Sequence, residues 1–239
     1  MSFAPNWSIK RFDNLESTQD YLQNLLNDNP DLSEGLVINA TSQSDGRGRH
    51  GRSWQGANGN LYLSFLIRPK CDIGKIGQIS LLSSLAIYRA ITSIIDEDVI
   101  LKWPNDILIG GKKCCGILLN HENDCLIIGV GVNIKSAPLD ISTFLQKYSN
   151  TEITAQDFMD RLLSLFSDYY KSWQNEGFTN LRDEWLNNTY EKGRKISVKI
   201  GDNKITGAFQ TIDMLGNLIL ICDKSGEEKK VTSGEILLL

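Results

Sequence analysis

The sequence predicts an α+β protein, in which a mixed sheet with flanking helices is followed by a small all-β unit. Three features of its 239 residues predict this fold. Apolar segments with the two-residue period of strands are interleaved with segments of helical period over positions 1–190. The helical period is strongest over residues 76–95 and 155–173. After Gly193 the apolar residues fall in short runs separated by glycine-containing turns, which is typical of an antiparallel β unit.

The N-terminal third contains one predicted helix, two predicted strands and a long loop. A Ser-Thr pair at 17–18 stands where a helix N-cap belongs, and the apolar spacing after it predicts a helix that ends near Asn29-Pro30. Residues 36–41 and 60–68 are β-rich and predict strands. Between them, residues 44–60 are rich in glycine and arginine and have no apolar period, so they predict a loop.

The middle of the chain predicts a helix, a run of strands and two further helices. The helix at 76–95 is expected to pack on the sheet. Gly110-Gly111 marks a tight hairpin turn within the strands that follow. The helix at 155–173 carries aromatic and leucine side chains on one face, and another helix is predicted at 178–190. The predicted strands lie at 99–103, 106–109, 113–122 and 125–134.

The C-terminal unit is predicted to contain four short strands. Turns with the sequences Gly-Asp-Asn, Leu-Gly-Asn and Ser-Gly-Glu separate them. Strands of this length with regular turns suggest a small β-barrel or sandwich. The predicted strands lie at 196–200, 205–212, 217–222 and 229–233.

Composition limits the class of protein. Hydrophobic residues make up 41% and charged residues 23% of the chain, as in a globular protein with a core. The formal net charge of −4 argues against a surface built to hold nucleic acid. No secretory signal and no membrane span are recognisable. The five cysteines form no Cys-x-x-Cys pair, and only His50 and His121 could assist them, so we expect free thiols in the cytoplasm and no metal site.

The segment from Gly46 to Trp54 is the least ordinary stretch of the chain. Three arginines and three glycines lie within residues 46–52. Guanidinium groups suit carboxylate and phosphate oxygens, and glycines let the backbone approach an anion closely. Trp54 can stack on a flat ring. These residues predict an anion-binding loop, while a solvated surface loop and an arginine-glycine tract for RNA remain the alternatives.

The sequence Lys102-Trp103-Pro104-Asn105-Asp106 is the second signal. Proline stiffens the end of the first strand, and Asn105 and Asp106 stand where the chain enters the next strand. Lys113 follows Asp106 by seven residues across the hairpin, so the two side chains can meet. Such a pair suits the handling of a phosphate and a nucleophilic amine, although a surface ion pair is the commoner occurrence. Gly116 and the glycines of residues 129–133 provide close approach for a ligand.

Taken together, these segments resemble the catalytic domain of biotin protein ligases. The joint occurrence of GRGR-x-GR-x-W and KWPND is far more specific than either motif alone. The resemblance implies a catalytic domain related to class II aminoacyl-tRNA synthetases at 1–190 and an SH3-like β-barrel at 191–239. In family order the matching stretches are ESTQ, GRGRHGRSW, NLYLS, KWPNDI, KKCCGIL and GVGVN.

The resemblance also implies an activity. Members of the family form biotinyl-5′-AMP from biotin and ATP with Mg²⁺, and then biotinylate one lysine of a biotin carboxyl carrier protein, as in acetyl-CoA carboxylase. A chain of this type is a biotin–[biotin carboxyl-carrier protein] ligase. A lipoate or octanoate ligase or transferase of the same fold is the alternative enzyme, and a non-catalytic RNA-binding protein is the alternative from another class. Either a monomer or a homodimer is compatible with the sequence.

The site residues follow from the same resemblance. Lys113, Asp106 and Arg47 are expected to be catalytic, with Lys113 touching both the biotin carboxylate and the α-phosphate and Asp106 orienting the carrier lysine. The biotin site is expected to comprise Ser17, Thr18, Gln43, Gly46, Arg47, Lys113 and Gly116. The ATP and adenylate site is expected to comprise Arg49, Arg52, Trp54, Lys102, Asn105, Lys113 and Asn133.

Three departures from the family pattern are visible. His50 stands where many members have a third loop arginine, and its neutral form at pH near 7 affects adenylate retention. Gln19 replaces the usual asparagine after Ser-Thr. The sequence begins almost directly at the catalytic domain, which predicts a ligase of the monofunctional type, without the N-terminal DNA-binding domain of the repressor members and without DNA as a partner.

Overall fold

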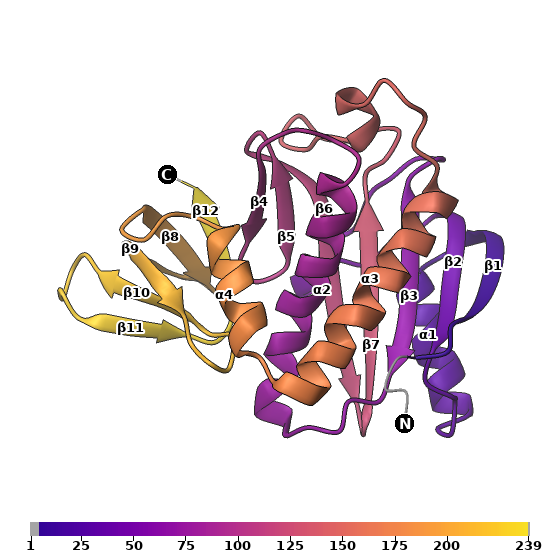
Figure 1. The fold of residues 1–239 in the computed structure, drawn as a ribbon, viewed down its shortest axis with the longest axis horizontal. Coiled ribbons are helices and arrows are strands. Elements are labelled where there is room, and N and C mark those ends of the chain that lie inside the picture. The colour runs from indigo at the N-terminus through magenta and orange to yellow at the C-terminus, as the bar shows by residue number, and fades with distance from the viewer. Residues whose placement is uncertain (1–4, 239) are drawn as a thin grey trace.

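The computed structural model describes residues 5–238 and arranges them around two β-sheets (Figure 1). One is a seven-stranded mixed sheet and the other a five-stranded antiparallel sheet. The predicted α+β fold with a C-terminal β unit is therefore confirmed. Residues 1–4 and 239, which belong to the ends of the two predicted domains, lie outside the described residues.

The large sheet has the strand order β1-β2-β3-β7-β6-β5-β4. β1 pairs in parallel with β2, and every other pair is antiparallel. β3 and β7 lie in the middle, and almost all their side chains are buried, which explains their continuous apolar sequences. The strands are β1 (Ser8–Leu15), β2 (Leu36–Gln43), β3 (Leu61–Ile67), β4 (Val99–Lys102), β5 (Asp106–Ile109), β6 (Lys112–Glu122) and β7 (Cys125–Val132).

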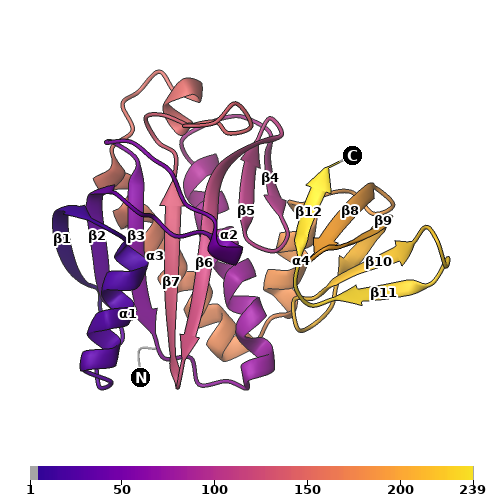
Figure 2. The ribbon, with the colours of Figure 1, turned by 180° about the vertical axis from the view of Figure 1, so that it is seen from behind.

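Helices cover both faces of this sheet. α2 and α3 lie on the face seen in Figure 1, and α1 lies on the opposite face, seen in Figure 2. The Oγ of Ser17 accepts a hydrogen bond from the backbone N–H of Asp20 at 3.2 Å and so caps α1. No helix among residues 5–238 combines the length and the apolar character that a membrane crossing requires. The helices are α1 (Thr18–Asp28), α2 (Ile76–Thr92), α3 (Ala155–Glu176) and α4 (Thr179–Asn187).

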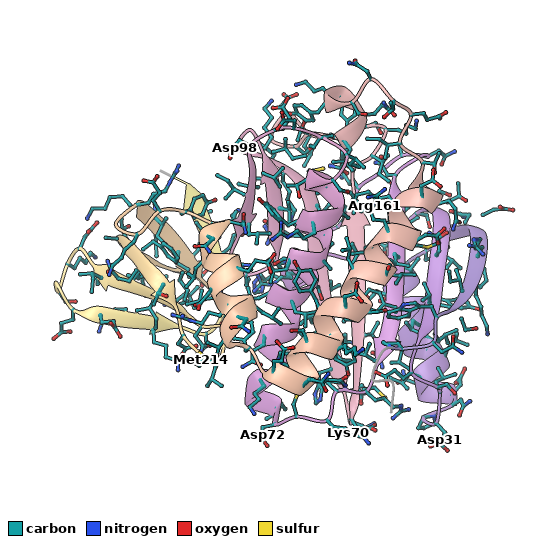
Figure 3. All side chains as sticks on the ribbon, in the orientation of Figure 1. Asp31, Lys70, Asp72, Asp98, Arg161 and Met214 are labelled. Atoms are coloured by element: carbon teal, nitrogen blue, oxygen red, sulfur yellow. The ribbon has the colours of Figure 1, made fainter. Side chains whose placement is uncertain are left out.

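The C-terminal sheet has the order β11-β10-β9-β8-β12 and is fixed to the body by hydrogen bonds. The indole N–H of Trp103 donates to the carbonyl of Gly216 at 2.9 Å. Gln78 Nε2 donates to the carbonyl of Met214, a residue labelled in Figure 3, at 2.6 Å. The strands are β8 (Lys195–Ile200), β9 (Asn203–Ile212), β10 (Leu218–Cys222), β11 (Glu228–Val231) and β12 (Glu235–Leu238).

Two strands were not predicted from the sequence. β1 is an edge strand whose side chains are mostly exposed, so it lacks the apolar alternation that marks a half-buried strand. β12 is only four residues long and follows Gly234, whose φ of 152° lies in a region that favours glycine. The expected strand at 229–233 therefore ends at Val231, and the C-terminal unit has five strands instead of four.

Two predicted helix ends were wrong. The helix expected at 76–95 ends at Thr92, although Ile95 after it is 6% exposed. The helix expected at 178–190 ends at Asn187, and Tyr190 beyond it is 4% exposed. In both cases an apolar residue is buried by a turn that follows the helix, and a periodic pattern cannot distinguish that turn from helix.

Trp185 is the largest fully buried side chain and joins α4 to α2. Its indole N–H donates to Ser84 Oγ at 3.0 Å. We expect Trp185→Ala to lower the free energy of unfolding by about 3–5 kcal/mol, because the substitution leaves a cavity and removes this hydrogen bond. Denaturant unfolding measures this, with the exposed Asn180→Ala on the same helix as the control. A loss of less than about 1 kcal/mol would show that α4 contributes little to the core.

Candidate active site

A cleft of about 830 Å³ lies on the sheet face opposite α2 and α3. Its walls come from the start of α1, the loop after β2, strands β5 to β7 and the start of β12. In Figure 2 the loop crosses in front of the sheet. The structure brings together in this cleft the predicted residues Ser17, Thr18, Gln43, Arg47, Arg49, Arg52, Trp54, Lys102, Asn105, Asp106, Lys113, Gly116 and Asn133.

Gly46 is the predicted site residue that does not line the cleft. It is buried behind the wall, where a Cβ atom would lie 2.5 Å from the carbonyl oxygen of Trp54 and 2.8 Å from Nε2 of Gln43. The backbone N–H of Trp54 also donates to the carbonyl of Gly46 at 2.7 Å. Glycine at this position therefore shapes the base of the loop.

One end of the cleft is neutral and polar. The backbone N–H of Thr18 donates to Gln43 Oε1 at 2.7 Å, which joins the start of α1 to the end of β2. The hydroxyl oxygens of Thr18 and Ser64 are 2.8 Å apart. Ser17 and Thr18 are each at most 3% exposed, and both line the cleft. Such a pocket can hold a compact uncharged ring through directed hydrogen bonds.

A Lys-Asp-Lys cluster lies deeper along the sheet. Lys113 Nζ is 2.6 Å from Asp106 Oδ1, and Lys102 Nζ is 3.5 Å from Asp106 Oδ2. The predicted approach of Lys113 to Asp106 is confirmed, because the turn at Gly110-Gly111 folds β6 back along β5. Two ammonium groups face one carboxylate, so the cluster carries an excess of positive charge that can hold an anionic ligand.

The arginine-glycine loop is fastened to the rest of the molecule. Within it, Arg47 and Ser53 form an antiparallel bridge around a 3-10 turn at Arg49–Gly51. Arg49 donates to Asn105 Oδ1 and to the carbonyl of Gly234, both at 3.1 Å. The loop is therefore not a freely solvated tract, since one guanidinium links it to β5 and to the C-terminal sheet.

A second anchor joins the loop to β12. Arg52 donates to Glu235 Oε1 at 3.0 Å. Burial alone would raise the pKa of Glu235, but the hydrogen bond and charge of Arg52, with the charge of Lys102, outweigh it and lower this pKa. Burial lowers the pKa of the Arg49 guanidinium, which stays charged because an arginine starts so high. Both anchors are therefore charged near neutral pH.

The Arg47 side chain forms ion pairs with two nearby carboxylates. Its Nε is 2.7 Å from Asp20 Oδ2, and one terminal nitrogen is 3.1 Å from Asp45 Oδ2. The side chain is 48% exposed, so these ion pairs contribute little to stability. Arg47 lies on the rim of the cleft, and its catalytic role stays a prediction.

Trp54 forms part of the cleft floor. A Cβ atom at Gly131 would lie 2.4 Å from its ring, and one at Gly116 would lie 2.9 Å from it, so the ring rests on two glycines. Lys113 Nζ lies 5.4 Å from the ring centroid. The indole N–H of Trp54 is buried without a hydrogen-bond partner among the described residues. Trp54 therefore places a flat surface and a free donor beside the Lys-Asp-Lys cluster.

Asn133 lies at the end of β7 and is 2% exposed. Its Nδ2 donates to the carbonyl of Thr143 at 3.1 Å, while Oδ1 has no partner among the described residues. An amide nitrogen carries two hydrogens, so Nδ2 keeps one for the expected contact with phosphate, which stays a prediction. The free Oδ1 suits a donor or a hydrated cation.

Some lining residues were not among the predicted site residues. Gly129 was noted only as a glycine that allows a ligand to approach, and Ser64 could have been singled out as a hydroxyl within an apolar strand. Residues 138–142 and Glu235 could not, because only the folded chain brings them to the cleft. Glu235 comes from the C-terminal sheet, far from the loop in sequence.

The fold and the cleft define an enzyme class once they are compared with known proteins. Residues 12–133 match the Biotin/lipoate A/B protein ligase family, and residues 193–239 match the Biotin protein ligase C terminal domain. The chain belongs to the Biotin/lipoate A/B protein ligase family. The predicted recognition as a biotin protein ligase, and hence as an enzyme, is confirmed by these matches together with the relatives below.

Three relatives illustrate the similarity. The chain is 31% identical to the Bifunctional ligase/repressor BirA of Bacillus subtilis, over 95% of this chain and 72% of the relative. It is 30% identical to the Biotin--[acetyl-CoA-carboxylase] ligase of Paracoccus denitrificans, over 80% of this chain and 86% of the relative. The biotin protein ligase from Aquifex aeolicus, solved in complex with biotin and ATP, superposes with a TM-score of 0.84 at 27% identity, covering 96% of this chain and 97% of that one.

Proposed function

We propose that this enzyme forms biotinyl-5′-AMP from biotin and ATP and then transfers biotin to one lysine of a biotin carboxyl carrier protein. The Lys-Asp-Lys cluster of Lys102, Asp106 and Lys113 carries the proposal, because it lies in one cleft between a neutral polar pocket and an arginine loop. The names of the relatives, which include a ligase for acetyl-CoA carboxylase, support this substrate and this partner.

The polar end is assigned to the bicyclic ring of biotin. Ser17, Thr18 and Gln43 would hydrogen bond its polar edge, with Arg47 at the rim of the pocket and Gly46 supporting the base of the loop. The absence of a side chain at Gly116 leaves room for the Trp54 ring and for the end of the Lys113 side chain. The acidic tail of biotin would then point toward the Lys113 ammonium, which pairs with a carboxylate.

The nucleotide is assigned to the other end of the cleft. Trp54 would contact the nucleotide through its flat ring, and the cations Arg49, Arg52 and Lys102 would balance the phosphate charge. Asn105 holds Arg49 in place. Mg²⁺ accompanies the nucleotide and supplies further charge neutralisation when bound. Asn133 Oδ1 lines the same cleft without a hydrogen-bond partner among the described residues, so this oxygen would be available to the hydrated ion.

The chemistry divides into two steps. In the first, a carboxylate oxygen of biotin attacks the α-phosphorus of ATP, a P–O bond forms, and the bond to pyrophosphate breaks. Both reactants are anionic, so the fixed ammonium of Lys113 lowers the repulsion between them. In the second, the carrier amine attacks the acyl carbon, AMP leaves, and the amine loses a proton. Asp106, which pairs with Lys113 in the cleft, would orient that amine.

Closure of the cleft protects the intermediate. A mixed anhydride is destroyed by water, so the loop fastened by Arg49 and Arg52 would keep solvent from it. The C-terminal sheet takes part because Gly234 and Glu235 are the acceptors. We place the boundary of the two domains at residues 190 and 191, between the two sheets. We place the enzyme in the cytoplasm, where its five cysteines would stay free.

Calorimetry and a transfer assay test the function. We expect heat of binding when biotin is added, followed by biotin-dependent release of pyrophosphate when ATP and Mg²⁺ are added. Label should then appear on the carrier domain of a biotin-dependent carboxylase, and lipoate or octanoate should not replace biotin. If biotin gives no heat, with or without nucleotide, the proposal fails. Activation of lipoate in preference to biotin would assign the enzyme to the other branch of the family.

A further inference from the structure

Gln19 occupies a buried position between three elements and is not among the residues assigned above. It lies in the first turn of α1, is 6% exposed, and lines the cleft. Its Nε2 donates to the carbonyl of Ile127 on β7 at 3.4 Å, and its Oε1 accepts from Ser64 Oγ on β3 at 3.1 Å. A Cβ atom at Gly129 would lie 2.4 Å from Oε1. Glycine on β7 therefore makes the space in which this amide lies.

The orientation of the Gln19 amide determines the direction of the neighbouring hydrogen bonds. The carbonyl of Ile127 can only accept, so Nε2 must face it and Oε1 must face Ser64. A serine hydroxyl has one hydrogen, and here Ser64 gives that hydrogen to Gln19. The 2.8 Å contact between Ser64 and Thr18 then requires the Thr18 hydroxyl as the donor. The single hydroxyl hydrogen of Thr18 is thereby used.

Thr18 and Ser17 consequently offer opposite polarity to the cleft. With its hydrogen directed to Ser64, Thr18 Oγ1 presents only a lone pair to a ligand. The hydrogen bond of the Ser17 side chain among the described residues is as acceptor from Asp20 N–H, so its hydroxyl hydrogen stays available to donate. An acceptor beside a donor matches the N–H and C=O groups of a urea.

We propose that Gln19 is a positioning residue that sets this polarity, so that the pocket receives a cyclic urea. The ring N–H of the urea donates to Thr18 Oγ1, and the urea carbonyl accepts from the hydroxyl of Ser17. The inference rests on the proposed function, because biotin is the cyclic urea in question. A head group without an N–H, such as a dithiolane, would leave the lone pair of Thr18 unpaired in a buried site, which costs binding energy.

The substitution Gln19→Glu provides the test, since a protonated carboxyl can donate to the Ile127 carbonyl as the amide does, whereas a carboxylate can only accept, is repelled by that carbonyl and should turn away from Ile127 and Ser64. Burial raises the pKa of such a carboxyl. We expect the dissociation constant of biotin, measured by calorimetry, to be at least about tenfold weaker than that of the wild type near pH 8. Near pH 5.5 it should return to within about threefold of the wild type, because the protonated group donates to Ile127 again. The wild-type constant should vary little over this range.

Gln23→Glu is the matched control, because the same substitution is made one turn later on α1, at a partly exposed position outside the cleft. It should bind biotin like the wild type at every pH.

Ser64→Ala is a second variant, which removes the hydroxyl group that links Gln19 to Thr18. We expect it to raise the KM for biotin by about tenfold and to leave the KM for ATP unchanged, a split that a general loss of structure would not give.

Two results would overturn the inference. One is a folded Gln19→Glu protein whose affinity for biotin follows the same pH profile as the wild type. The other is Ser64→Ala with an unchanged KM for biotin. If the wild-type protein itself gives no heat with biotin, the proposed function and the inference fail together. If the wild type binds biotin but the affinity of Gln19→Glu does not depend on pH, only the inference fails.

Discussion

Replacing Lys113 with alanine is expected to reduce formation of biotinyl-5′-AMP by about a thousandfold. The ammonium of Lys113 lies in the cleft, 2.6 Å from Asp106, and is the cation that we propose brings the two anionic reactants together. The variant should remain folded, because Asp106 keeps Lys102 as an ionic partner and the Lys113 side chain is 35% exposed. Biotin-dependent release of pyrophosphate measures the loss, and thermal unfolding measures the fold.

Lys112→Ala is the matched control for this experiment. Lys112 is the exposed neighbour on β6 and does not line the cleft. Its removal changes the net charge equally, so it separates a local effect from a general electrostatic one. The role assigned to Lys113 is wrong if Lys113→Ala retains more than about a tenth of wild-type turnover, or if the two variants lose activity equally.

Arg49→Gly is expected to release the adenylate before transfer. The substitution removes the hydrogen bonds to Asn105 and to Gly234 that fasten the loop to β5 and to the C-terminal sheet. With a less firmly held loop, biotinyl-5′-AMP escapes and reacts with lysines of any nearby protein. We expect labelling of an unrelated bystander protein to rise by at least about tenfold relative to labelling of the carrier domain.

Ala57→Gly is the control in the same segment between β2 and β3. Ala57 is exposed and does not line the cleft. Glycine there changes the segment without removing either anchor. Labelled peptides identified by mass spectrometry compare the variants. Unchanged selectivity in Arg49→Gly, or an equal increase in Ala57→Gly, would contradict the role of Arg49 as an anchor.

The sequence alone was sufficient to predict the strongly periodic elements. α3 begins at Ala155 as expected, because one face of that segment is apolar over several turns. The hairpin at Gly110-Gly111 was predicted because glycine pairs adopt the positive φ values that such a turn needs, here 54° and 77°. The edge strand at Ser8–Leu15 was missed, since an exposed edge carries no apolar alternation. Helix ends were misplaced where a following turn is also buried.

The candidate site was predictable to a similar extent. The loop of residues 46–52 and the Lys113–Asp106 pair stood out, because clustered cations and a hairpin spacing are local in sequence. The direction in which Arg47 turns was not predictable, since it depends on Asp20 from another element. The free oxygen of Asn133 likewise follows from the carbonyl of Thr143, a partner that only the folded chain supplies.

By itself, therefore, the sequence determined the class of enzyme, its α+β architecture and most of the predicted side chains that line the cleft. Composition, the period of apolar residues and short motifs are local properties, so they can be recognised in the sequence alone. Only the tertiary structure decided that Glu235 fastens the loop and that Gln19 directs the hydroxyls of Ser64 and Thr18. These contacts join residues far apart in the chain, and the direction of a hydrogen bond is set by what surrounds both partners once the chain has folded.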